Sequence, residues 1–217
     1  MKNIPEYNGN LRKHILRVPD IIDTASGIRV FGRVIKSLVF TTDIAIIRNC
    51  NADAVMAVYP FTPQPIITDA IVASSDKPVF SGVGGGTTRG PRVIGLAMDA
   101  ERQGAHGVVV NAPTSNTIIR LAKQSLEIPI IITITDIDTD ISARINAGAA
   151  ILNVSAASKT PEIVRHIRES YPDVPIIATG GPTEESIQET IDAGANAITY
   201  TPPSTASLFK GIMQSYR

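Results

Sequence analysis

The chain has 217 residues, of which 43% are hydrophobic and 18% are charged, a composition that fits one globular domain and excludes a disordered chain. Basic and acidic residues number 20 each, so the chain lacks the bulk positive charge with which proteins bind nucleic acid or anionic membranes. The single cysteine, Cys50, excludes an internal disulfide framework and a multi-cysteine zinc site.

Residues 1–26 precede the regular pattern of the chain, and we expect them to form a short N-terminal helical extension. They lack the apolar core of a signal peptide. The longest apolar runs, such as residues 128–134, are far shorter than the roughly 20 residues that a membrane-spanning helix needs. We therefore expect a cytoplasmic protein with a small-molecule partner and without a membrane or nucleic-acid partner, and a homo-oligomer stays open.

From residue 27 to residue 217, two series of short apolar runs alternate along the chain. In the first series a Gly or Asn followed by Ala opens a β-rich run, and the pattern recurs every 44 to 53 residues. In the second series a proline opens a β-branched run, at the strand position where a missing N–H does little harm. The second series starts near Pro78, Pro129 and Pro175, and residues 34–42 form a similar run without the proline.

The segments between these runs have the start and stop signals of helices. One begins with Thr160 and Pro161, and another has acidic residues after Thr183 and ends at Gly194. Apolar strands joined by helices form a parallel sheet covered on both faces. Eight such units predict an α/β protein with a compact (β/α)8 TIM barrel over residues 27–217. An open doubly wound sheet is the alternative, but it would not explain four equivalent quarter-units.

In a (β/α)8 barrel, ligands bind at the carboxyl ends of the strands, so the residues after each apolar run are candidate site residues. In this chain they are mostly hydroxyl, amide and glycine residues, with few charges. Alternate residues of a strand share a face, so we expect Thr133 with Thr135, and Asn153 with Ser155, to face the pore. Asn111 and Asn153 are candidate catalytic residues.

Two glycine loops, residues 84–86 and 180–181, follow the third and seventh runs. Glycine lets backbone N–H groups approach an anion, and the helix that follows adds its dipole. We therefore predict phosphate binding at these loops and after the eighth run, although ordinary tight turns also use glycine. The predicted binding residues are Gly84, Gly85, Gly86, Arg89, Thr179, Gly180, Gly181, Thr201, Ser204 and Thr205.

Residues 175–204 contain Pro-Ile-Ile-Ala-Thr-Gly-Gly followed by Ala-Gly-Ala-Asn-Ala-Ile. This stretch resembles the last quarter of the ribulose-phosphate-binding barrel superfamily, which includes thiamine-phosphate synthase, the keto-deoxy-phosphogluconate aldolases and the phosphoribosyl isomerases. The loop Gly82-Val-Gly-Gly-Gly is similar to that of the two-phosphate barrels of histidine biosynthesis. The resemblance covers about half of the chain, and it implies a barrel that binds a phosphorylated metabolite.

The chain departs from that superfamily at two places. The sixth run, residues 151–155, lacks the Schiff-base lysine of the aldolases, and Lys159 lies beyond it. Pro202 and Pro203 stand where the last phosphate loop usually has glycine. In the histidine-pathway isomerases, opposed carboxylates after the first and fifth strands act as acid and base, and the resemblance assigns these roles to Asp43 and Asp136. Each Asp could instead cap the following helix.

We therefore expect an isomerase, epimerase or lyase that acts on a small phosphorylated metabolite and needs no cofactor. One alternative is a non-catalytic phosphometabolite sensor, because the glycerol-phosphate-responsive antiterminators resemble this chain in size and in the paired glycines. Another alternative is a Mg2+-dependent phosphoester hydrolase, with Asp136, Asp138 and Asp140 as ligands. We expect surface or packing roles for the histidines, which are His14, His106 and His166.

Overall fold

The computed structural model describes residue 5 and residues 15–215, and within them eight parallel strands close into a barrel. The predicted (β/α)8 fold is thereby confirmed. The last barrel strand pairs with the first, which closes the ring. In chain order the strands are β3 (Ser37–Phe40), β4 (Ala54–Ala57), β5 (Val79–Gly84), β6 (Gly107–Val110), β7 (Ile130–Ile134), β8 (Ile151–Val154), β9 (Ile176–Thr179) and β10 (Ala197–Tyr200).

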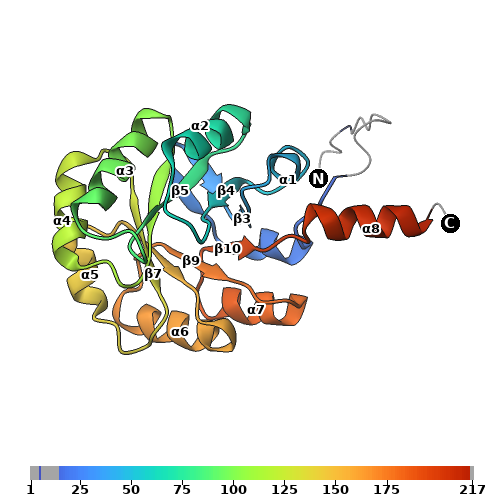
Figure 1. The fold of residues 1–217 in the computed structure, drawn as a ribbon. Helices are drawn as coiled ribbons and strands as arrows, with labels where there is room; N and C mark the ends of the chain where they lie inside the picture. The colour runs from blue at the N-terminus through green and yellow to red at the C-terminus, as the bar shows by residue number, and fades with distance from the viewer. Residues whose placement is uncertain (1–4, 6–14, 216–217) are drawn as a thin grey trace.

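A helix follows each barrel strand. The helices are α1 (Ile44–Arg48), α2 (Pro65–Ser74), α3 (Pro91–Arg102), α4 (Asn116–Ser125), α5 (Ile141–Ala147), α6 (Thr160–Ser170), α7 (Glu184–Asp192) and α8 (Thr205–Ser215). Figure 1 shows α1 to α7 in a counter-clockwise ring around the strands, whereas α8 extends away from the ring. Because parallel crossovers are right-handed, the carboxyl ends of the strands face the viewer. In the part of the chain that the structure describes, no helix is long and apolar enough to cross a membrane.

An antiparallel hairpin precedes the barrel and was not predicted. It consists of β1 (Ile28–Val30) and β2 (Arg33–Ile35). The expectation of one strand over residues 34–42 was therefore wrong, because the run is divided at Lys36, whose amide donates to the carboxylate of Asp53 at 2.8 Å. The hairpin closes the amino-terminal end of the barrel with the buried side chains of Ile28, Val30 and Ile35.

The described part of the N-terminal extension contains one short 3-10 helix, η2 (Asp20–Thr24). Figure 1 shows η2 in the gap of the helix ring between α7 and α1. Ile22 of η2 has no exposed surface and belongs to the same core cluster as Ile198 of β10. The N-terminal segment thus covers the barrel where an eighth outer helix would be expected. Residues 15–19 and 25–26 of the predicted helical extension are not helical, and Leu16 instead forms an isolated parallel bridge with Cys50. Residues 6–14 of the extension, including His14, lie outside the described residues.

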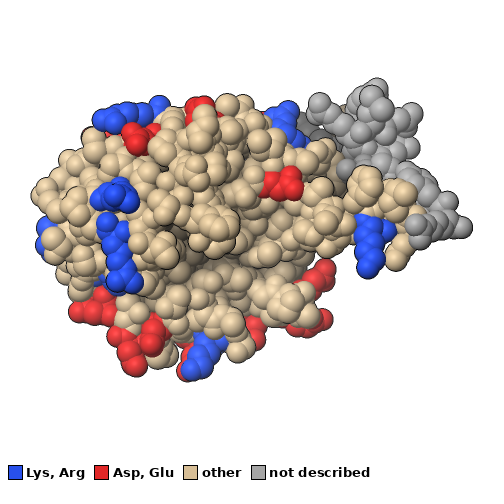
Figure 2. Space-filling model, in the orientation of Figure 1, with Lys and Arg blue, Asp and Glu red and all other residues tan. Residues whose placement is uncertain are grey.

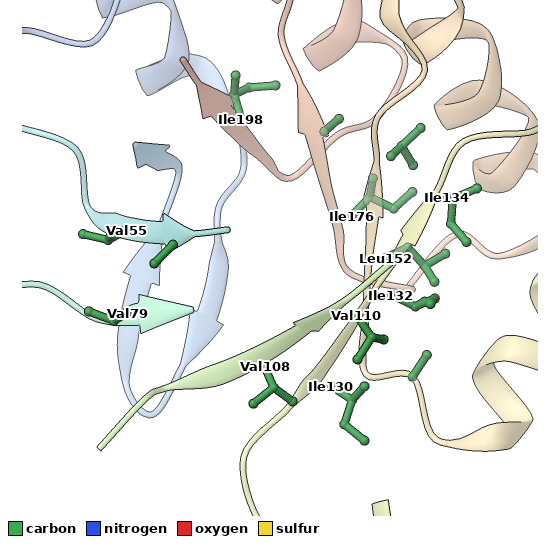
Figure 3. Close-up of a cluster of buried hydrophobic side chains, with 14 of the residues drawn as sticks. Val55, Val79, Val108, Val110, Ile130, Ile132, Ile134, Leu152, Ile176 and Ile198 are labelled. Carbon is green, nitrogen blue, oxygen red and sulfur yellow. The ribbon is translucent and has the colours of Figure 1, made fainter. Parts of the chain in front are cut away.

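The barrel strands carry two layers of buried apolar side chains, as the alternation of faces along a strand requires. The outward layer packs against the helices, and Figure 3 shows ten labelled members of it, among them Val108, Ile132 and Ile198. The inward layer fills the lower and middle barrel with Leu38, Met56, Phe80, Val109, Ile131, Ile151 and Ile177. Inward-facing polar residues therefore occur toward the carboxyl ends of the strands.

Candidate functional site

At the carboxyl-terminal mouth of the barrel, the inward-facing side chains of β7, β8 and β9 are polar but uncharged. Asn153 pairs in register with Thr133, and its Nδ2 donates to the Oγ1 of Thr133 at 3.3 Å. The hydroxyl of Thr179 donates to the Oγ of Ser155 at 3.1 Å. Figure 2 shows the same face, where most acidic and basic side chains lie toward the edges and uncharged residues surround the central hollow.

Two polar atoms in this mouth are buried without a hydrogen-bond partner among the described residues. They are the Oδ1 of Asn153 and the Oγ1 of Thr199, in residues that are 7% and 6% exposed. A buried polar atom without a partner costs on the order of 1–3 kcal/mol. A ligand with hydrogen-bonding groups would remove this cost, so these atoms mark the mouth as a place for a polar ligand.

A cavity of about 190 Å³, named here the β5 pocket, opens beside the glycine loop after β5. The loop needs its glycines, because Gly84 and Gly85 have φ angles of 116° and 99°. A Cβ at Gly85 would lie 2.0 Å from the Oγ1 of Thr114. The amide of Asn111 donates to the carbonyl of Gly84 at 2.9 Å. The pocket is lined by Val58, Tyr59, Pro60, Phe61, Pro63, Gly82, Gly84, Gly86, Thr87, Thr88, Val109 and Asn111.

The turn of this loop leaves hydrogen-bond donors unused. The amide of Gly85 donates to the carbonyl of Thr88 at 2.8 Å, whereas the amides of Gly86, Thr87 and Thr88 donate to no described residue. The hydroxyl oxygen of Thr88 is also buried without a partner among the described residues, although Thr88 is only 5% exposed. The exposed Arg89 donates its Nε to the carbonyl of Gly86 at 2.7 Å. Its guanidinium therefore lies against the loop.

A larger cavity, named here the β9–β10 pocket, has a volume of about 590 Å³. Of the residues predicted to bind phosphate, it brings together Thr179, Gly181 and Thr201. Gly180 is not in the lining, and a Cβ there would lie 2.7 Å from Ile198, so this glycine permits close packing. The pocket is lined by Pro19, Thr179, Gly181, Pro182, Thr183, Glu184, Ile187, Thr199, Tyr200, Thr201, Pro202 and Pro203.

The start of α7, at the edge of this pocket, is capped by side chains of the same helix turn. Thr183 and Ser186 form a capping box, in which each side chain binds the backbone of the other residue. The backbone amide of Glu185 and the hydroxyl of Thr183 lower the pKa of the Glu185 carboxyl. Glu184 adds a second carboxylate to the same helix turn and lines the pocket.

The residues predicted to bind phosphate at the start of α8 also have partners within the chain. The Oγ of Ser204 accepts the amide of Ser207 at 3.1 Å, which makes Ser204 a helix cap. The hydroxyl of Thr205 donates to the carboxylate of Asp43. The structure therefore places Ser204 and Thr205 after β10, as the sequence predicts, but occupies their side chains with contacts inside the protein.

Asp43 and Asp136, the predicted acid–base pair, both accept backbone amides. Asp43 caps α1 by accepting the amides of Ala45 and Ile46 at 2.8 and 3.3 Å. The hydrogen bond from Thr205, and then those from Ile46 and Ala45, lower the pKa of the Asp43 carboxyl. Asp136 is exposed, and its Oδ1 accepts the amide of Asp138 at 3.0 Å. The capping alternative thus describes Asp43, while a catalytic role for the pair stays a prediction.

The acidic segment after β7 does not form a cluster suited to a metal ion. Asp140 caps α5 by accepting the amide of Ala143 at 2.9 Å. Within residue 5 and residues 15–215, no group of three or more His, Cys, Asp or Glu side chains is arranged to hold a metal. The geometry therefore gives no support to a Mg2+ site built from Asp136, Asp138 and Asp140.

The described histidines lie away from the mouth. His106 directly precedes β6, at its amino-terminal end, and contacts the ring of Phe31 edge to face at 6.2 Å between centroids. Burial, and then the charge of Arg33, lower the pKa of His106. His166 is exposed on α6. These positions agree with the predicted packing and surface roles.

Sequence reasoning missed Thr88, Thr199 and Glu184. Thr199 could have been found from strand alternation, because it lies two residues after the inward-facing Ala197. The missing partner of Thr88 has no sequence signal, since it depends on how the loop packs against Thr114 and Asn111. The negative charge that Glu184 adds to the β9–β10 pocket could have been predicted, because Glu184 lies in the first turn of a predicted helix beside the expected phosphate site.

No protein-family model matches the sequence, and the search of curated proteins gives no match. Among solved structures, the chain is similar to the phosphoenolpyruvate phosphomutase of Streptomyces platensis subsp. rosaceus, with a TM-score of 0.63 and 14% identity over 90% of this chain and 82% of that chain. It is also similar to 2,3-dimethylmalate lyase, a PEP mutase/isocitrate lyase superfamily member, with a TM-score of 0.63 and 14% identity over 94% of this chain and 84% of that one.

A third similar structure is the 4-hydroxy-tetrahydrodipicolinate synthase of Methylacidiphilum fumariolicum SolV, with a TM-score of 0.60 and 14% identity over 78% of this chain and 68% of that chain. At such low identities the likeness shows the TIM-barrel fold alone. None of these three structures is a ribulose-phosphate-binding barrel, so that resemblance stays a prediction.

Proposed function

We propose that the protein is an enzyme of the lyase, mutase or isomerase kind that acts on a small phosphorylated metabolite at the mouth of the barrel. The observation that carries this proposal is the ring of uncharged polar side chains with unpartnered buried atoms on Asn153 and Thr199. Ligand sites in (β/α)8 barrels lie at this end. The structural neighbours include a phosphomutase and a lyase, which supports the reaction class.

The proposal assigns different tasks to different groups in the mouth. Asn111, Asn153 and Thr133 would orient the substrate by hydrogen bonds, because each presents a neutral donor or acceptor. Asp136 would move a proton, since one of its carboxylate oxygens has no described partner and it follows β7 by two residues. Asp43 is the weaker candidate, because both of its carboxylate oxygens are used by α1 and by Thr205.

Paired ligands test the proposal directly. Phosphorylated metabolites and their dephosphorylated counterparts are added at millimolar concentration, and the melting temperature is measured. At least one phosphorylated member should raise the melting temperature, because a ligand that binds only the folded state stabilises it. The Asn153→Ala variant should lose that rise, and the matched variant Asn146→Ala, on the exposed face of α5, should keep it. The proposal is contradicted if no phosphorylated metabolite raises the melting temperature more than its dephosphorylated counterpart does.

A non-catalytic sensor of phosphorylated metabolites is the second candidate. It is favoured by the absence of charged side chains from the inward-facing residues of the described barrel strands. A metabolite that stabilises the protein should be followed by NMR after prolonged incubation. Conversion that is lost in Asp136→Asn supports the enzyme, whereas unchanged metabolite supports the sensor. Retention on RNA at low salt would support an antiterminator-like sensor in particular.

A further inference from the structure

We infer that the phosphate of the ligand binds in the β5 pocket, on the amides of Gly86, Thr87 and Thr88, and not at the loops after β9 and β10. This inference rests on the proposed function and adds its anion-binding subsite. Phosphate sites in (β/α)8 barrels are often built from the loops after the seventh and eighth strands, which are β9 and β10 here. Both pockets have backbone amides without a described acceptor and one buried, unpartnered threonine hydroxyl, but they differ in charge, and this difference reverses that preference.

The β5 pocket offers what an oxyanion needs. Three successive amides, those of residues 86–88, have no described acceptor, and successive free amides in a tight turn form an anion-binding concavity. The hydroxyl of Thr88 is buried and unpartnered, so a ligand oxygen would supply its missing hydrogen bond. The lining contains no acidic residue. The guanidinium of Arg89, held at the carbonyl of Gly86, adds positive charge next to the loop.

The size of the β5 pocket fits a chemical group better than a whole metabolite. Its volume of about 190 Å³ is below the roughly 300–1,000 Å³ of pockets that enclose complete small molecules. The glycines hold the loop in this shape, because Gly84 and Gly85 have positive φ angles and a Cβ at either would lie 3.0 Å or less from a neighbouring atom. The rest of the ligand would then extend over the polar mouth toward Asn153.

The β9–β10 pocket presents the opposite charge. Glu184 lines it, and the carboxylate of Glu185 accepts the donors at the start of α7. Ser204 and Thr205 hydrogen-bond to Ser207 and Asp43 within the chain. A phosphate at this end would lie close to the carboxylate of Glu184, and like charges repel. The substrate class is therefore a monophosphate rather than a bisphosphate.

Inorganic phosphate is the probe that locates the subsite. It is titrated into the full chain, and backbone amide signals are followed by NMR. The amide signals of Gly86, Thr87 and Thr88 should change their chemical shifts until the site is saturated. The amide signals of Glu184 and Ala206 should keep their chemical shifts. The Thr88→Val variant should bind phosphate roughly tenfold more weakly, because it loses one hydrogen bond to a charged group. The matched variant Thr199→Val removes an equally buried and unpartnered hydroxyl from the other pocket, and it should bind phosphate as the wild type does.

A second variant guards against a folding defect in Thr88→Val. Gly86→Ala adds a methyl group that meets only the Nδ2 of Asn111, at 3.2 Å, so the fold should persist while phosphate binding falls. The inference is overturned if the amide signals near Glu184 and Ala206 shift instead, or if no amide signal shifts. It is also overturned if only Thr199→Val loses affinity for phosphate. When phosphorylated metabolites bind but the perturbed amides lie beside α7, only the subsite is wrong. When phosphate binds at residues 86–88 but no metabolite binds, the proposed function is wrong instead.

Discussion

Single carboxylates in this protein mainly serve the backbone around them. Asp53 accepts the amides of Lys36 and Ser37, at 2.8 and 3.0 Å, where the hairpin gives way to the barrel. Asp43 caps α1 and accepts the hydroxyl of Thr205. The side-chain contacts of an acidic residue therefore decide between capping and catalysis, and position in the sequence does not.

Substitution of Asp43 tests its capping role. At neutral pH, Asp43→Ala should lower the free energy of unfolding by about 1 kcal/mol, the usual cost of losing a helix N-cap, and Asp43→Asn should lower it less. The folded-state pKa of this carboxyl is lowered, so the charged form stabilises the protein above the ordinary pKa of 3.8. Urea unfolding at several pH values measures the free energy of unfolding of the wild type and of Asp43→Ala. The difference between the two should shrink as the pH falls through the lowered pKa. A difference that grows on acidification would contradict this role.

Strand alternation predicted two of the inward-facing polar residues of the mouth, although it was not applied to Thr199. Thr133 and Asn153 were expected on the pore side, and they form a hydrogen bond there. The unpartnered state of Thr88 and Thr199 could not be predicted, because it depends on atoms from other loops. The sequence therefore indicates where polar groups gather, while the three-dimensional structure shows which of them still lack a partner.

The loop after β6 depends on a side chain from another helix. Arg144 of α5 donates to the carbonyls of Ala112 and Thr114 and to the Oδ1 of Asn116. This loop supports the glycine turn of the β5 pocket, since Thr114 packs against Gly85. Arg144 thus acts on the pocket by positioning the loop, without lining the pocket itself.

Arg144→Lys should loosen this loop, because an ammonium group cannot reproduce the planar set of guanidinium hydrogen bonds. We expect a loss of roughly 1–3 kcal/mol in the free energy of unfolding, and faster amide hydrogen exchange in residues 112–116 and 84–88. The control is Arg102→Lys, because Arg102 forms an exposed ion pair with Asp99 at 3.4 Å. This substitution should change the free energy of unfolding only slightly. Unchanged amide hydrogen exchange in residues 84–88 would show that the loop after β6 does not support the glycine turn after β5.

Most elements were predictable from local signals, and the exceptions have a physical cause. Proline at strand starts and glycine at helix ends marked the barrel units, as at Pro129 and Gly194. The hairpin of β1 and β2 was missed because residues 34–42 are apolar throughout most of their length, which hides the break at Lys36. The direction of α8 could not be predicted, because it depends on η2 filling the eighth position of the ring.

On the scale of the whole molecule, α8 should be dispensable for the barrel. Neither buried cluster contains a residue of α8, and the described side chains of this helix are exposed. A chain that ends at Pro203 should unfold cooperatively, with a melting temperature lower by about 2–4 °C because the hydrogen bond to Asp43 is lost. Calorimetry checks this, and non-cooperative unfolding of the truncated chain would contradict the expectation.

The short helix η2 should matter much more for stability. Ile22→Ala should lower the free energy of unfolding by about 2–5 kcal/mol, because Ile22 is fully buried. Calorimetry also measures this loss, and an unchanged melting temperature would contradict it.

The homo-oligomer stays a prediction at this scale. Leu208, Phe209 and Met213 of α8 are 37%, 64% and 42% exposed, and exposed apolar groups of this kind often mark protein contacts. Sedimentation of the full chain and of the chain that ends at Pro203 would show whether α8 is needed for association.

Closure of the barrel joins distant parts of the chain, with a consequence for its synthesis. β10 pairs with β3, and the side chain of Asn196 donates to the Oγ of Ser26, 170 residues earlier. The ribosome therefore exposes β3 on the order of ten seconds before β10 has been translated. Until then the nascent sheet has two open edges, which are templates for pairing with other chains. A holdase chaperone that covers those edges should raise the yield of folded protein during translation.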